Sequence, residues 1–363
     1  MRLGFILWGG SVGGAQTVTA SLVRELRRRG HEAALLFVTD PHPLAQNLEE
    51  SGIPYRTLGY PRGSRVLLHP RTLARAASEL GPDGIVSPSP GYLPAALRFG
   101  GYRGRLVAVN HGRLLQLPAL PPAARVLRRT DRAIGFWAPD QEVAVSDYLL
   151  ERLRRERLHA RRLVRIYNGI DHERYGSNGA ESSRDGSFRI AWAGRMIPGK
   201  GVDDLLRAVA LLAKEGDARL VLAGDGPDRA LLADLASSLG LTDRVEFVGW
   251  VRDMAAFWRR VDIAVVPSHQ FVESFGMVAL EAMACARPAI VSRNGGLPEV
   301  VDEGKTGELF EPGDVEGLVA AIRTYASDET KRHEHGLQAK DRAARLFGID
   351  RTAASYLELF KAT

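Results

Sequence analysis

The sequence lacks most features that would place it in a specialised class of protein. A single cysteine, Cys285, stands among 363 residues, so no internal disulfide can form, and this composition fits a reducing cytoplasm. No apolar run reaches the roughly 18 residues that a membrane-spanning helix requires. The apolar stretch near the amino end, residues 3–8, is too short for a secretory signal and runs directly into glycines. We therefore expect a soluble, globular, cytoplasmic protein.

Lysine is scarce, and the net charges of the two halves differ in sign. Only 6 of the 49 basic residues are lysines, and the first of them is Lys200. Residues 1–175 carry a net charge of +11, and the remainder carries −5. The basic half predicts an anionic partner, either phospholipid head groups on the inner face of the membrane or an acidic acceptor. The alternative is an arginine-rich surface without any partner.

Two basic segments, residues 125–132 and 151–162, are where such a peripheral membrane contact is expected. An ordinary surface helix explains the second segment more simply, because leucines occupy one side of it and arginines crowd the others. A nucleic-acid partner is not expected, since the sequence has neither a basic patch interleaved with aromatic residues nor a reading motif.

The pattern of apolar residues predicts an α/β protein. Short apolar strands alternate with amphipathic helical stretches from end to end, an order typical of helices packed on parallel sheets. A polar stretch rich in glycine and serine, residues 175–187, interrupts this alternation and predicts a linker. The expected strands lie at residues 3–8, 33–38, 84–86, 106–110, 142–146, 163–168, 188–194, 219–224, 245–249, 262–268 and 288–292.

The linker divides the chain into two predicted domains. We expect a first domain at residues 1–174, a second at 188–347, and a carboxy-terminal helix at 348–363 that crosses back to the first domain. Each domain is expected to be a Rossmann-like, doubly wound sheet, and the two are expected to face a central cleft. Ligands of such sheets bind beyond the carboxyl ends of the strands, where loops lead into helices.

Two glycine-containing loops after predicted strands could hold a phosphate. In GGSVGGA, residues 9–15, glycines let backbone N–H groups approach an anion at the start of a helix. Its spacing is not that of the dinucleotide-binding fingerprint, and a tight turn without a ligand is the alternative. In AGRMIPGKG, residues 193–201, the cations Arg195 and Lys200 could grip phosphate oxygens. Gly201 stands where nucleotide hydrolases carry a metal-binding hydroxyl, which argues against that class.

A third loop carries two acids eight residues apart. Glu273 precedes a helix expected from about Gly276, and Glu281 lies on its second or third turn. A rise of about 1.5 Å per residue separates the acids by roughly 12 Å along the axis. Paired acids of a glycoside hydrolase flank one bond at about 5–9.5 Å, so the wider spacing suits the two ends of an extended ligand. Backbone N–H groups of residues 274–277 would point at its anionic middle. The alternative is that Glu273 complements the helix dipole and Glu281 is solvated.

Several motifs together resemble family 4 of the retaining glycosyltransferases, which have the GT-B fold. The motifs are GGAQ at 13–16, NGID at 168–171, GRMIPGKG at 194–201, LAGDGP at 222–227, VEFVGWV at 245–251 and the run at 267–314. The resemblance spans nearly the whole chain, and the second-domain motifs are the specific ones. It implies transfer of a hexosyl or amino-hexosyl group from a nucleotide-diphosphate sugar to a hydroxyl of a sugar, lipid or natural-product acceptor. The anomeric configuration would be retained.

By motif position, the resemblance implies how the donor is bound. Arg195 and Lys200 would hold the diphosphate, and Glu281 would take the ribose hydroxyls. Glu273 would hold the hexose and phosphates together with the backbone of the residues that follow it, namely Ser274, Phe275, Gly276 and Met277. UDP is favoured as the nucleotide, with GDP as the alternative.

The resemblance also assigns residues other than these four acidic and basic side chains. Gly13 and Gly14 would close over the diphosphate from the first domain. Gly249 and Val251 would border the base. His111, in VNHGR, matches the family's histidine near the reacting sugar, and the alternative is a buried structural histidine. The chain departs from the family pattern at Ala286 and Gly112: alanine replaces a glycine that usually ends a helix, and glycine replaces a polar residue near the acceptor.

The expected mechanism uses neither a metal nor a cofactor. No D-x-D triplet occurs, so a metal that bridges the diphosphate has no obvious ligands. No side chain is marked as a covalent nucleophile, which favours reaction on one face of the sugar with the departing phosphate accepting the acceptor's proton. The residues expected to act in catalysis are His111, Arg195, Lys200 and Glu273.

Other classes remain as alternatives. A nucleotide-sugar hydrolase or epimerase would keep the donor site without a sugar acceptor. An NAD-dependent oxidoreductase could share the sheet topology, although its glycine spacing is missing and it has no use for Glu273. A nucleotide hydrolase or kinase lacks its hydroxyl at Gly201.

Overall fold

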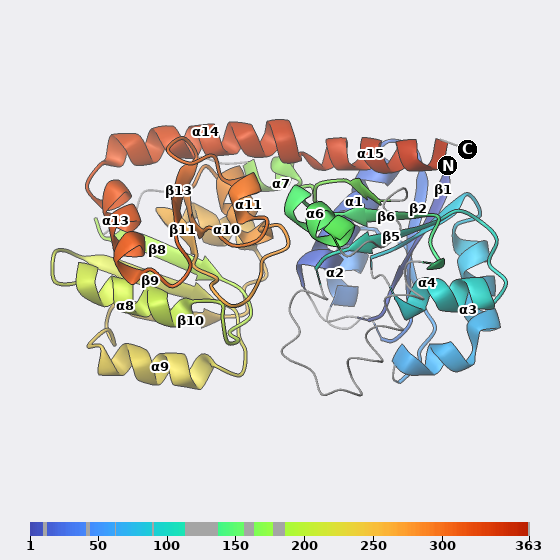
Figure 1. The fold of residues 1–363 in the computed structure, drawn as a ribbon, viewed down its shortest axis with the longest axis horizontal. Helices are drawn as coiled ribbons and strands as arrows, with labels where there is room; N and C mark the ends of the chain where they lie inside the picture. Colours follow the sequence, from blue (N-terminus) through green and yellow to red (C-terminus); the bar gives the residue numbers. More distant parts are fainter. Residues whose placement is uncertain are drawn as a thin grey trace. The chain divides into compact units, whose positions relative to one another are not determined.

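The chain, described here by a computed structural model, divides into two compact units (Figure 1). One comprises residues 1–169 together with 349–363, and the other comprises residues 170–348. The basic segment at 125–132 lies outside the described residues, as do much of the second basic segment and the centre of the predicted linker. The structure describes residues 1–9, 13–40, 44–61, 63–88, 91–112, 137–155, 163–176 and 186–361.

Within its described residues, the first unit is built on a seven-stranded sheet in which every neighbouring pair is parallel. In spatial order its strands are β3 (Tyr55–Thr57), β2 (Glu32–Phe37), β1 (Arg2–Leu7), β4 (Gly84–Ser87), β5 (Leu106–Asn110), β6 (Gln141–Ala144) and β7 (Leu163–Arg165). The strand order reverses between β1 and β4. A doubly wound sheet opens its ligand crevice at the carboxyl ends of such a pair.

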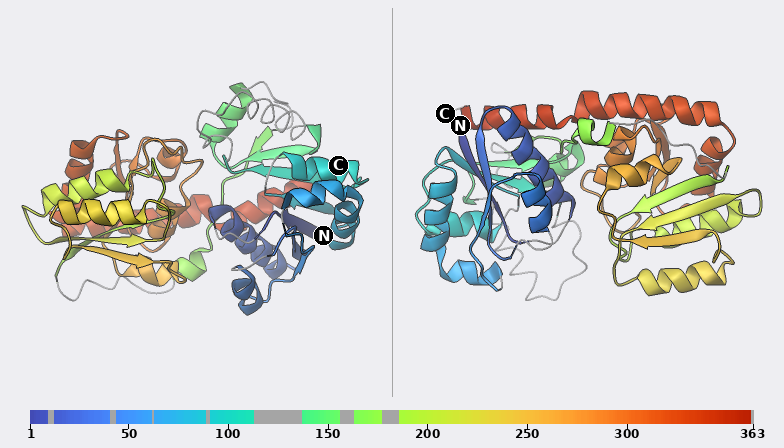
Figure 2. Two further views of the ribbon diagram at one scale, coloured as in Figure 1. Left: turned by 90° about the horizontal axis from the view of Figure 1, so that it is seen from below. Right: turned by 180° about the vertical axis from the view of Figure 1, so that it is seen from behind.

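Helices cover both faces of the first sheet (Figure 2). On one face, Leu73 and Leu97 pack against Ile6 and Ile85 of the sheet. The other face is covered by the first and last helices of the chain, which contact each other. The helices of this unit are α1 (Gly14–Arg28), α2 (Leu44–Glu50), the 3-10 helix η1 (Gly63–Leu68), α3 (Pro70–Leu80), α4 (Tyr92–Phe99), α6 (Asp147–Arg155) and α15 (Ile349–Lys361).

The second unit repeats the plan with six parallel strands. In spatial order they are β10 (Val245–Gly249), β9 (Ala218–Ala223), β8 (Phe188–Ala193), β11 (Ile263–Val266), β12 (Ala289–Ser292) and β13 (Gly307–Phe310). The order reverses between β8 and β11, so the loops after these two strands are where the doubly wound plan places a ligand.

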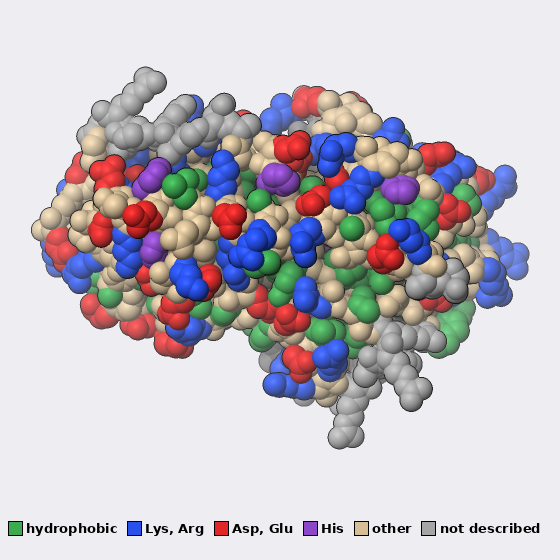
Figure 3. Space-filling view, turned by 90° about the horizontal axis from the view of Figure 1, so that it is seen from above, with side chains coloured by type: hydrophobic (Ala, Val, Ile, Leu, Met, Phe, Trp, Pro, Cys, Tyr) green, Lys and Arg blue, Asp and Glu red, His purple; other side chains and the backbone are tan. Residues whose placement is uncertain are grey.

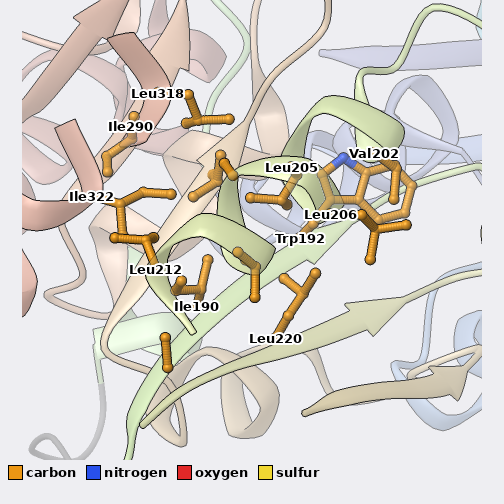
Figure 4. Close-up of a cluster of buried hydrophobic side chains, with 14 of the residues drawn as sticks. Ile190, Trp192, Val202, Leu205, Leu206, Leu212, Leu220, Ile290, Leu318 and Ile322 are labelled. Carbon is orange, nitrogen blue, oxygen red and sulfur yellow. The ribbon is translucent and has the colours of Figure 1, made fainter. Parts of the chain in front are cut away.

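A buried apolar cluster joins one face of this sheet to its helices (Figure 4). Trp192 of β8 lies beside Leu205 and Leu206, and Ile290 of β12 lies near Ile322. The helices of the second unit are α7 (His172–Gly176), α8 (Val202–Leu212), α9 (Arg229–Ser238), α10 (Met254–Arg259), α11 (Met277–Ala284), α12 (Leu297–Val300), α13 (Val315–Ala326) and α14 (Glu329–Phe347).

The boundary between the units lies before α7, earlier than the sequence suggested. Residues 170–174, assigned to the first domain by their sequence, belong to the second unit. The reason is packing, because α7 contacts α10, α11 and α14. The thiol of Cys285 also donates to the carbonyl oxygen of Tyr175 at 3.3 Å. Residues 349–363 belong to the first unit.

The described helices and one face of the surface bear on the question of membrane contact. Among the described residues, none of the helices combines the length and the apolar character needed to cross a bilayer. On the face drawn in Figure 3, basic and acidic side chains are intermixed.

Candidate functional site

The loop after β8, residues 194–201, packs closely on the loop after β11. Gly201 has a φ of 71°, and a Cβ there would lie 1.9 Å from the carbonyl oxygen of Pro267. The carbonyl oxygen of Gly199 accepts a hydrogen bond from the backbone N–H of Phe271 at 3.1 Å. Only glycine permits this approach, so the two loops form one surface at the carboxyl edge of the sheet.

Lys200 and Glu273 form an ion pair across these two loops. The Nζ atom donates to Oε1 of Glu273 at 2.7 Å, and both side chains are largely buried. The same ammonium lies 3.7 Å from the centroid of the Phe271 ring. The hydroxyl of Ser268 donates to the same oxygen of Glu273 at 2.7 Å. A cation and a carboxylate, both expected to bind the donor, therefore meet directly.

The backbone around Glu273 is clamped by a residue that the sequence did not single out. The Nδ2 atom of Asn294 donates to the carbonyl oxygens of Ser268 at 2.9 Å and Phe271 at 3.1 Å. The N–H of Gly296 donates to the carbonyl oxygen of Glu273 at 2.8 Å. Ser268 and Asn294 each follow a buried strand at the sheet's carboxyl edge, and that position is the signal that could have found them.

Helix α11 begins directly after this loop without a side-chain cap. Its N-cap residue, Gly276, has a φ of 123°, and within the described chain no side chain accepts from the first N–H groups of α11. These groups and the helix dipole favour an anion at this end. The ring of Phe275 is buried against Phe347 at 5.5 Å between centroids, so this residue offers only its backbone to a ligand.

Glu281 lies one turn further along α11 and is partly buried. Trp258 donates its ring N–H to Oε2 of Glu281 at 3.5 Å. Burial raises the pKa of the Glu281 carboxyl to about 7. Trp258, Arg174 and Tyr175 partly oppose this rise through hydrogen bonds and the arginine's charge. The alternative that Glu281 is merely solvated is therefore wrong.

Arg195 differs from Lys200 in being exposed. It follows Gly194 at the end of β8, and its guanidinium has no hydrogen-bond or ion-pair partner among the described residues. The next side chain, Met196, is fully buried and anchors the loop. A long cationic side chain on an anchored loop can reach an anion at the sheet edge.

The loops after β9 and β10 join the same edge. The N–H of Gly224 donates to the carbonyl oxygen of Gly249 at 2.6 Å. A Cβ at Gly224 would lie 1.9 Å from the carbonyl oxygen of Gly194, so the loop after β9 touches the loop after β8. Val251, two residues after Gly249, is partly buried. The residues expected to border the base thus belong to the contiguous edge that carries Lys200.

A large groove of about 530 Å³ lies elsewhere on this unit, mainly against the amino ends of β9 and β10. It shares only Val251 with the expected site. Four arginines line it, namely Arg189, Arg219, Arg244 and Arg260. This groove is therefore not the place where the expected donor residues meet.

Two acids and a histidine lie beside the Lys200 loop. Asp203, Asp204 and His269 place one ligand atom each within 4.8 Å of one another. The guanidinium of Arg207 lies 3.2 Å from Asp203 and 3.6 Å from Asp204, so the acids already have a cation. This cluster is a self-contained ionic network at the start of α8.

In the first unit, Gly13 and Gly14 lie at the junction of β1 and α1. Gly13 is extended, with φ −152°, and its carbonyl oxygen accepts from the N–H of Thr17 at 3.1 Å. Gly14 is the first residue of α1. Residues 10–12 of the glycine loop lie outside the described residues.

His111 follows β5 at the carboxyl edge of the same sheet. Burial lowers the pKa of its imidazole to about 4, so the ring is neutral near pH 7. The neighbouring backbone is held in place, since Gly112 donates its N–H to Oδ1 of Asn110 at 2.9 Å. Asn110 in turn donates to the buried carboxyl of Glu142 at 3.0 Å. The second departure from the family pattern, Gly112, has a φ of 77°, which glycine adopts without strain.

The structure thus gathers the expected donor residues of the second unit along one sheet edge, with Lys200 and Glu273 in contact. Gly13, Gly14 and His111 share the corresponding edge of the first sheet.

Comparison with known families covers almost the whole chain. The model described as "Glycosyltransferase Family 4" matches residues 12–174, and the model described as "Glycosyl transferases group 1" matches residues 178–342. Among curated proteins, N-acetyl-alpha-D-glucosaminyl L-malate synthase of Bacillus anthracis is 28% identical over 373 residues, covering 96% of this chain and 94% of the relative. The GDP-mannose-dependent alpha-(1-6)-phosphatidylinositol dimannoside mannosyltransferase of Mycobacterium tuberculosis is also 28% identical, covering 96% and 93%.

Solved structures resemble the chain over its full length. Anabaena HepE, crystallised with UDP and glucose, has a TM-score of 0.85 at 23% identity, covering 100% of both chains. Sucrose-phosphate synthase from Thermosynechococcus elongatus has a TM-score of 0.80 at 22% identity, covering 99% of both chains.

Proposed function

Because the chain belongs to family 4 of the glycosyltransferases and has the GT-B fold that its sequence predicted, we propose that it transfers a hexosyl or amino-hexosyl group with retention of configuration. The donor is a nucleotide-diphosphate sugar, and the acceptor is a hydroxyl of a sugar, lipid or natural product. That the chain is a glycosyltransferase rests on its family. Family membership overturns the alternatives of an oxidoreductase and of a nucleotide hydrolase or kinase.

The observation that carries the proposal is the Lys200–Glu273 ion pair beside the uncapped start of α11. We assign the diphosphate to Lys200, Arg195 and the N–H groups of residues 274–277. An incoming diphosphate replaces the carboxylate as the partner of the ammonium, which frees Glu273 to accept hydroxyls of the hexose. Glu281 receives the ribose hydroxyls, and Gly249 with Val251 borders the base.

Catalysis in this proposal depends on the charges that develop on the diphosphate and on the sugar in the transition state. The bond between the anomeric carbon and the diphosphate oxygen breaks, so negative charge grows on the diphosphate while positive charge grows on the sugar. Fixed cations and helix-start N–H groups stabilise the diphosphate most at that moment, which lowers the barrier. The acceptor oxygen bonds to the same face of the carbon, and its proton passes to the departing diphosphate.

The first unit supplies the remaining parts. Gly13 and Gly14 offer backbone N–H groups to the diphosphate at the start of α1. His111 contacts the reacting sugar as a neutral imidazole, because its pKa is lowered to about 4. A neutral ring can accept or donate a hydrogen bond to a sugar hydroxyl without adding a charge that opposes the developing positive centre.

UDP is the favoured nucleotide of the proposed donor, and GDP is the alternative. Anabaena HepE has been crystallised with UDP-glucose, whereas the mycobacterial mannosyltransferase is named for GDP-mannose. We place the enzyme in the cytoplasm, in peripheral contact with anionic lipid on the inner face of the membrane. Melting shifts measured across UDP-, GDP- and ADP-sugars identify the base, because only a bound donor stabilises the folded protein.

The test of the donor site is Lys200→Ala. Turnover is expected to fall at least about tenfold, the order of magnitude lost with one charge-stabilising donor. The matched control is Lys214→Ala, which removes an exposed lysine just beyond α8 and leaves turnover unchanged. Turnover is measured as nucleotide diphosphate release, with product analysis to separate transfer from hydrolysis or epimerisation. Unchanged turnover and unchanged nucleotide affinity in Lys200→Ala would refute the assignment.

Metal independence has its own test. We expect turnover to persist after dialysis against EDTA and to gain less than about twofold when Mg²⁺ or Mn²⁺ is added, since the cations of the loop already neutralise the diphosphate. Loss of activity in EDTA with recovery by a divalent ion would contradict this mechanism.

A further inference from the structure

One corner of the first unit exposes three large apolar side chains. Leu68 of η1, Phe99 of α4 and Trp137 are 76%, 69% and 57% exposed, which places them among the most exposed large hydrophobic side chains of the described residues. We call these three residues the corner patch. Exposed apolar side chains that stand alone are ordinary, but a group of three on one corner calls for a partner.

The three side chains lie together because their elements touch. The rings of Phe99 and Trp137 have centroids 5.8 Å apart. Gly100, which follows Phe99, lies against the start of α3, where a Cβ would be only 1.9 Å from the carbonyl oxygen of Pro70. Leu68 stands two residues before Pro70, and η1 packs on α4. The rings of Phe99 and Trp137 are therefore in contact, and Leu68 belongs to an element that packs on the helix bearing Phe99.

A largely buried arginine fixes this surface. The Nε atom of Arg98 donates to the carbonyl oxygen of Ala138 at 2.9 Å, and Nη2 donates to the carboxylate of Asp140 at 2.7 Å. These bonds join the residue before Phe99 to the residue after Trp137. The two aromatic rings are consequently held side by side before anything binds. A binding event therefore loses little further side-chain entropy.

The surroundings of the corner patch are basic. Arg71 follows Pro70, and Arg103 lies just beyond the end of α4; both are exposed. The nearby carboxylate of Asp140 is already paired with Arg98. Residues 1–175 as a whole carry a net charge of +11.

We propose that the corner patch is an interfacial anchor that inserts into a bilayer containing anionic lipid. Side chains that are more than half exposed protrude from the surface, so they suit a deformable partner that closes around them. Tryptophan, phenylalanine and leucine partition into the head-group region, and arginines beside them attract anionic lipid, which gives the two signals that stable anchoring requires. This inference rests on the proposed peripheral membrane contact and assigns it to a surface distinct from the basic segments at 125–132 and 151–162.

The experiment is co-sedimentation of the full chain with phosphatidylcholine vesicles, with and without phosphatidylglycerol. The wild type is expected to bind the anionic vesicles and to bind neutral ones weakly. The double variant Phe99→Ser with Trp137→Ser is expected to bind the anionic vesicles at least about tenfold more weakly, because it loses its buried apolar area. The remaining charge-driven binding should vanish in high salt, whereas the wild type retains part of its binding.

A matched control comes from the second unit. Leu231→Ser with Leu337→Ser removes two exposed leucines, 69% and 52% exposed, and should bind vesicles like the wild type. Both double variants should melt within a few degrees of the wild type and turn over a water-soluble acceptor at the wild-type rate. That readout separates the anchor from the proposed catalytic function.

Fluorescence gives an independent reading of insertion. Brominated lipid is expected to quench Trp137 and not Trp250, which is 63% exposed but belongs to the second unit. Trp192 and Trp258 are buried in that unit. Quenching should disappear in Trp137→Phe, which retains an aromatic anchor and should still sediment with vesicles.

The outcomes are distinguishable. Absence of wild-type binding to anionic vesicles would overturn the membrane contact and the anchor together. Wild-type binding by the Phe99 and Trp137 double variant would overturn the anchor alone and leave the basic segments as the contact. A concentration-dependent dimer that the double variant abolishes would reassign the surface to a second copy of the chain and also overturn the anchor.

Discussion

Ala286 is the only residue other than glycine that has a positive φ among those the structure describes, at 57°. It lies just after α11, where the resemblance to the family had indicated an unusual alanine in place of glycine. A left-handed conformation forces the Cβ of an L-residue against the following carbonyl and costs roughly 1–2 kcal/mol. The chain therefore carries strain at the end of the helix that bears Glu281.

We predict that Ala286→Gly stabilises the protein. Relief of the strain exceeds the extra entropy of glycine in the unfolded chain, so a net gain of up to about 1 kcal/mol is expected. For a unit of this size that corresponds to roughly 2–4 °C in melting temperature, measured by calorimetry. The same substitution at Ala326, the exposed last residue of α13, should instead destabilise, because the backbone there is helical. A fall in melting temperature for Ala286→Gly would contradict the strain.

At this scale, the sequence showed which residues to examine but not how they are paired. Lys200 and Glu273 could be singled out because each lies on a loop at a strand's carboxyl end. Their 2.7 Å contact could not be predicted, since it depends on how loops after β8 and β11 pack. Asn294 was not singled out because its role consists of hydrogen bonds to backbone atoms of a distant loop. In the sequence, only its position after a buried strand marks it.

Strands β5 and β6 are joined by a hydrogen bond between side chains as well as by the backbone hydrogen bonds of the sheet. Asn110 at the end of β5 donates to the carboxyl of Glu142 on β6, which is 3% exposed and has a second oxygen without a partner among the described residues. Burial raises the pKa of Glu142 to about 7, and the hydrogen bond from Asn110 opposes only part of the rise.

The pH dependence of stability follows from this raised pKa. Above a pH of about 4.5 the unfolded chain loses the Glu142 proton while the folded chain keeps it, so stability falls as pH rises toward about 7 and is constant above. We predict that Glu142→Gln, which still accepts a hydrogen bond from Asn110, raises the free energy of unfolding by up to about 3 kcal/mol at a pH near 8. Near pH 5 the substitution should leave the free energy of unfolding unchanged. Urea denaturation at the two pH values measures it. Glu32→Gln, an exposed carboxyl on β2, is the control and should leave the pH dependence unaltered. An equal pH dependence in Glu142→Gln and the wild type would rule out this account.

The strands that escaped the sequence analysis are the short ones. All eleven expected strands overlap observed strands, whereas β3 and β13, of 3 and 4 residues, were not expected. β3 is half-exposed or exposed throughout, so it carries no apolar run. The expected end of the first domain, residue 174, falls inside α7, because a five-residue helix has little periodicity. Its contacts with α10 and α11 place it in the second unit.

At the scale of the whole molecule, helix α15 contributes to the packing of a unit from which it is distant in sequence. α15 ends the chain but belongs to the first unit, where it packs on α1. The ring of Phe360 lies over β4, since a Cβ at Gly84 would be 2.2 Å from it. Thr352 donates its hydroxyl to the carbonyl oxygen of Tyr167 at 3.1 Å.

We predict that Phe360→Ala destabilises the first unit by about 3–5 kcal/mol through the cavity it leaves. Hydrogen exchange should then quicken in β1 and β4 and remain unchanged in the second unit. Glu358→Ala, an exposed neighbour paired only with Lys361, should change stability by less than about 0.5 kcal/mol. Uniform loss of protection across both units would show that they do not unfold separately.

The two-sheet plan was predictable because alternation of strands and helices recurs on either side of a polar segment. The second unit's motifs follow strands, so the sequence also predicted that their residues would share one edge of the sheet. The boundary at residue 170 was not predictable, because the chain crosses between units twice and only tertiary contacts show where.

Because α15 follows the second unit in the chain but belongs to the first, it determines the order in which the two units are completed during synthesis. The strands of the first unit leave the ribosome first, but the helix that covers their α1 side follows only after all of residues 170–348. The unit made first is therefore completed last. A nascent chain arrested before residue 349 would carry an intact second unit joined to a first sheet still open on one side, a natural target for chaperones.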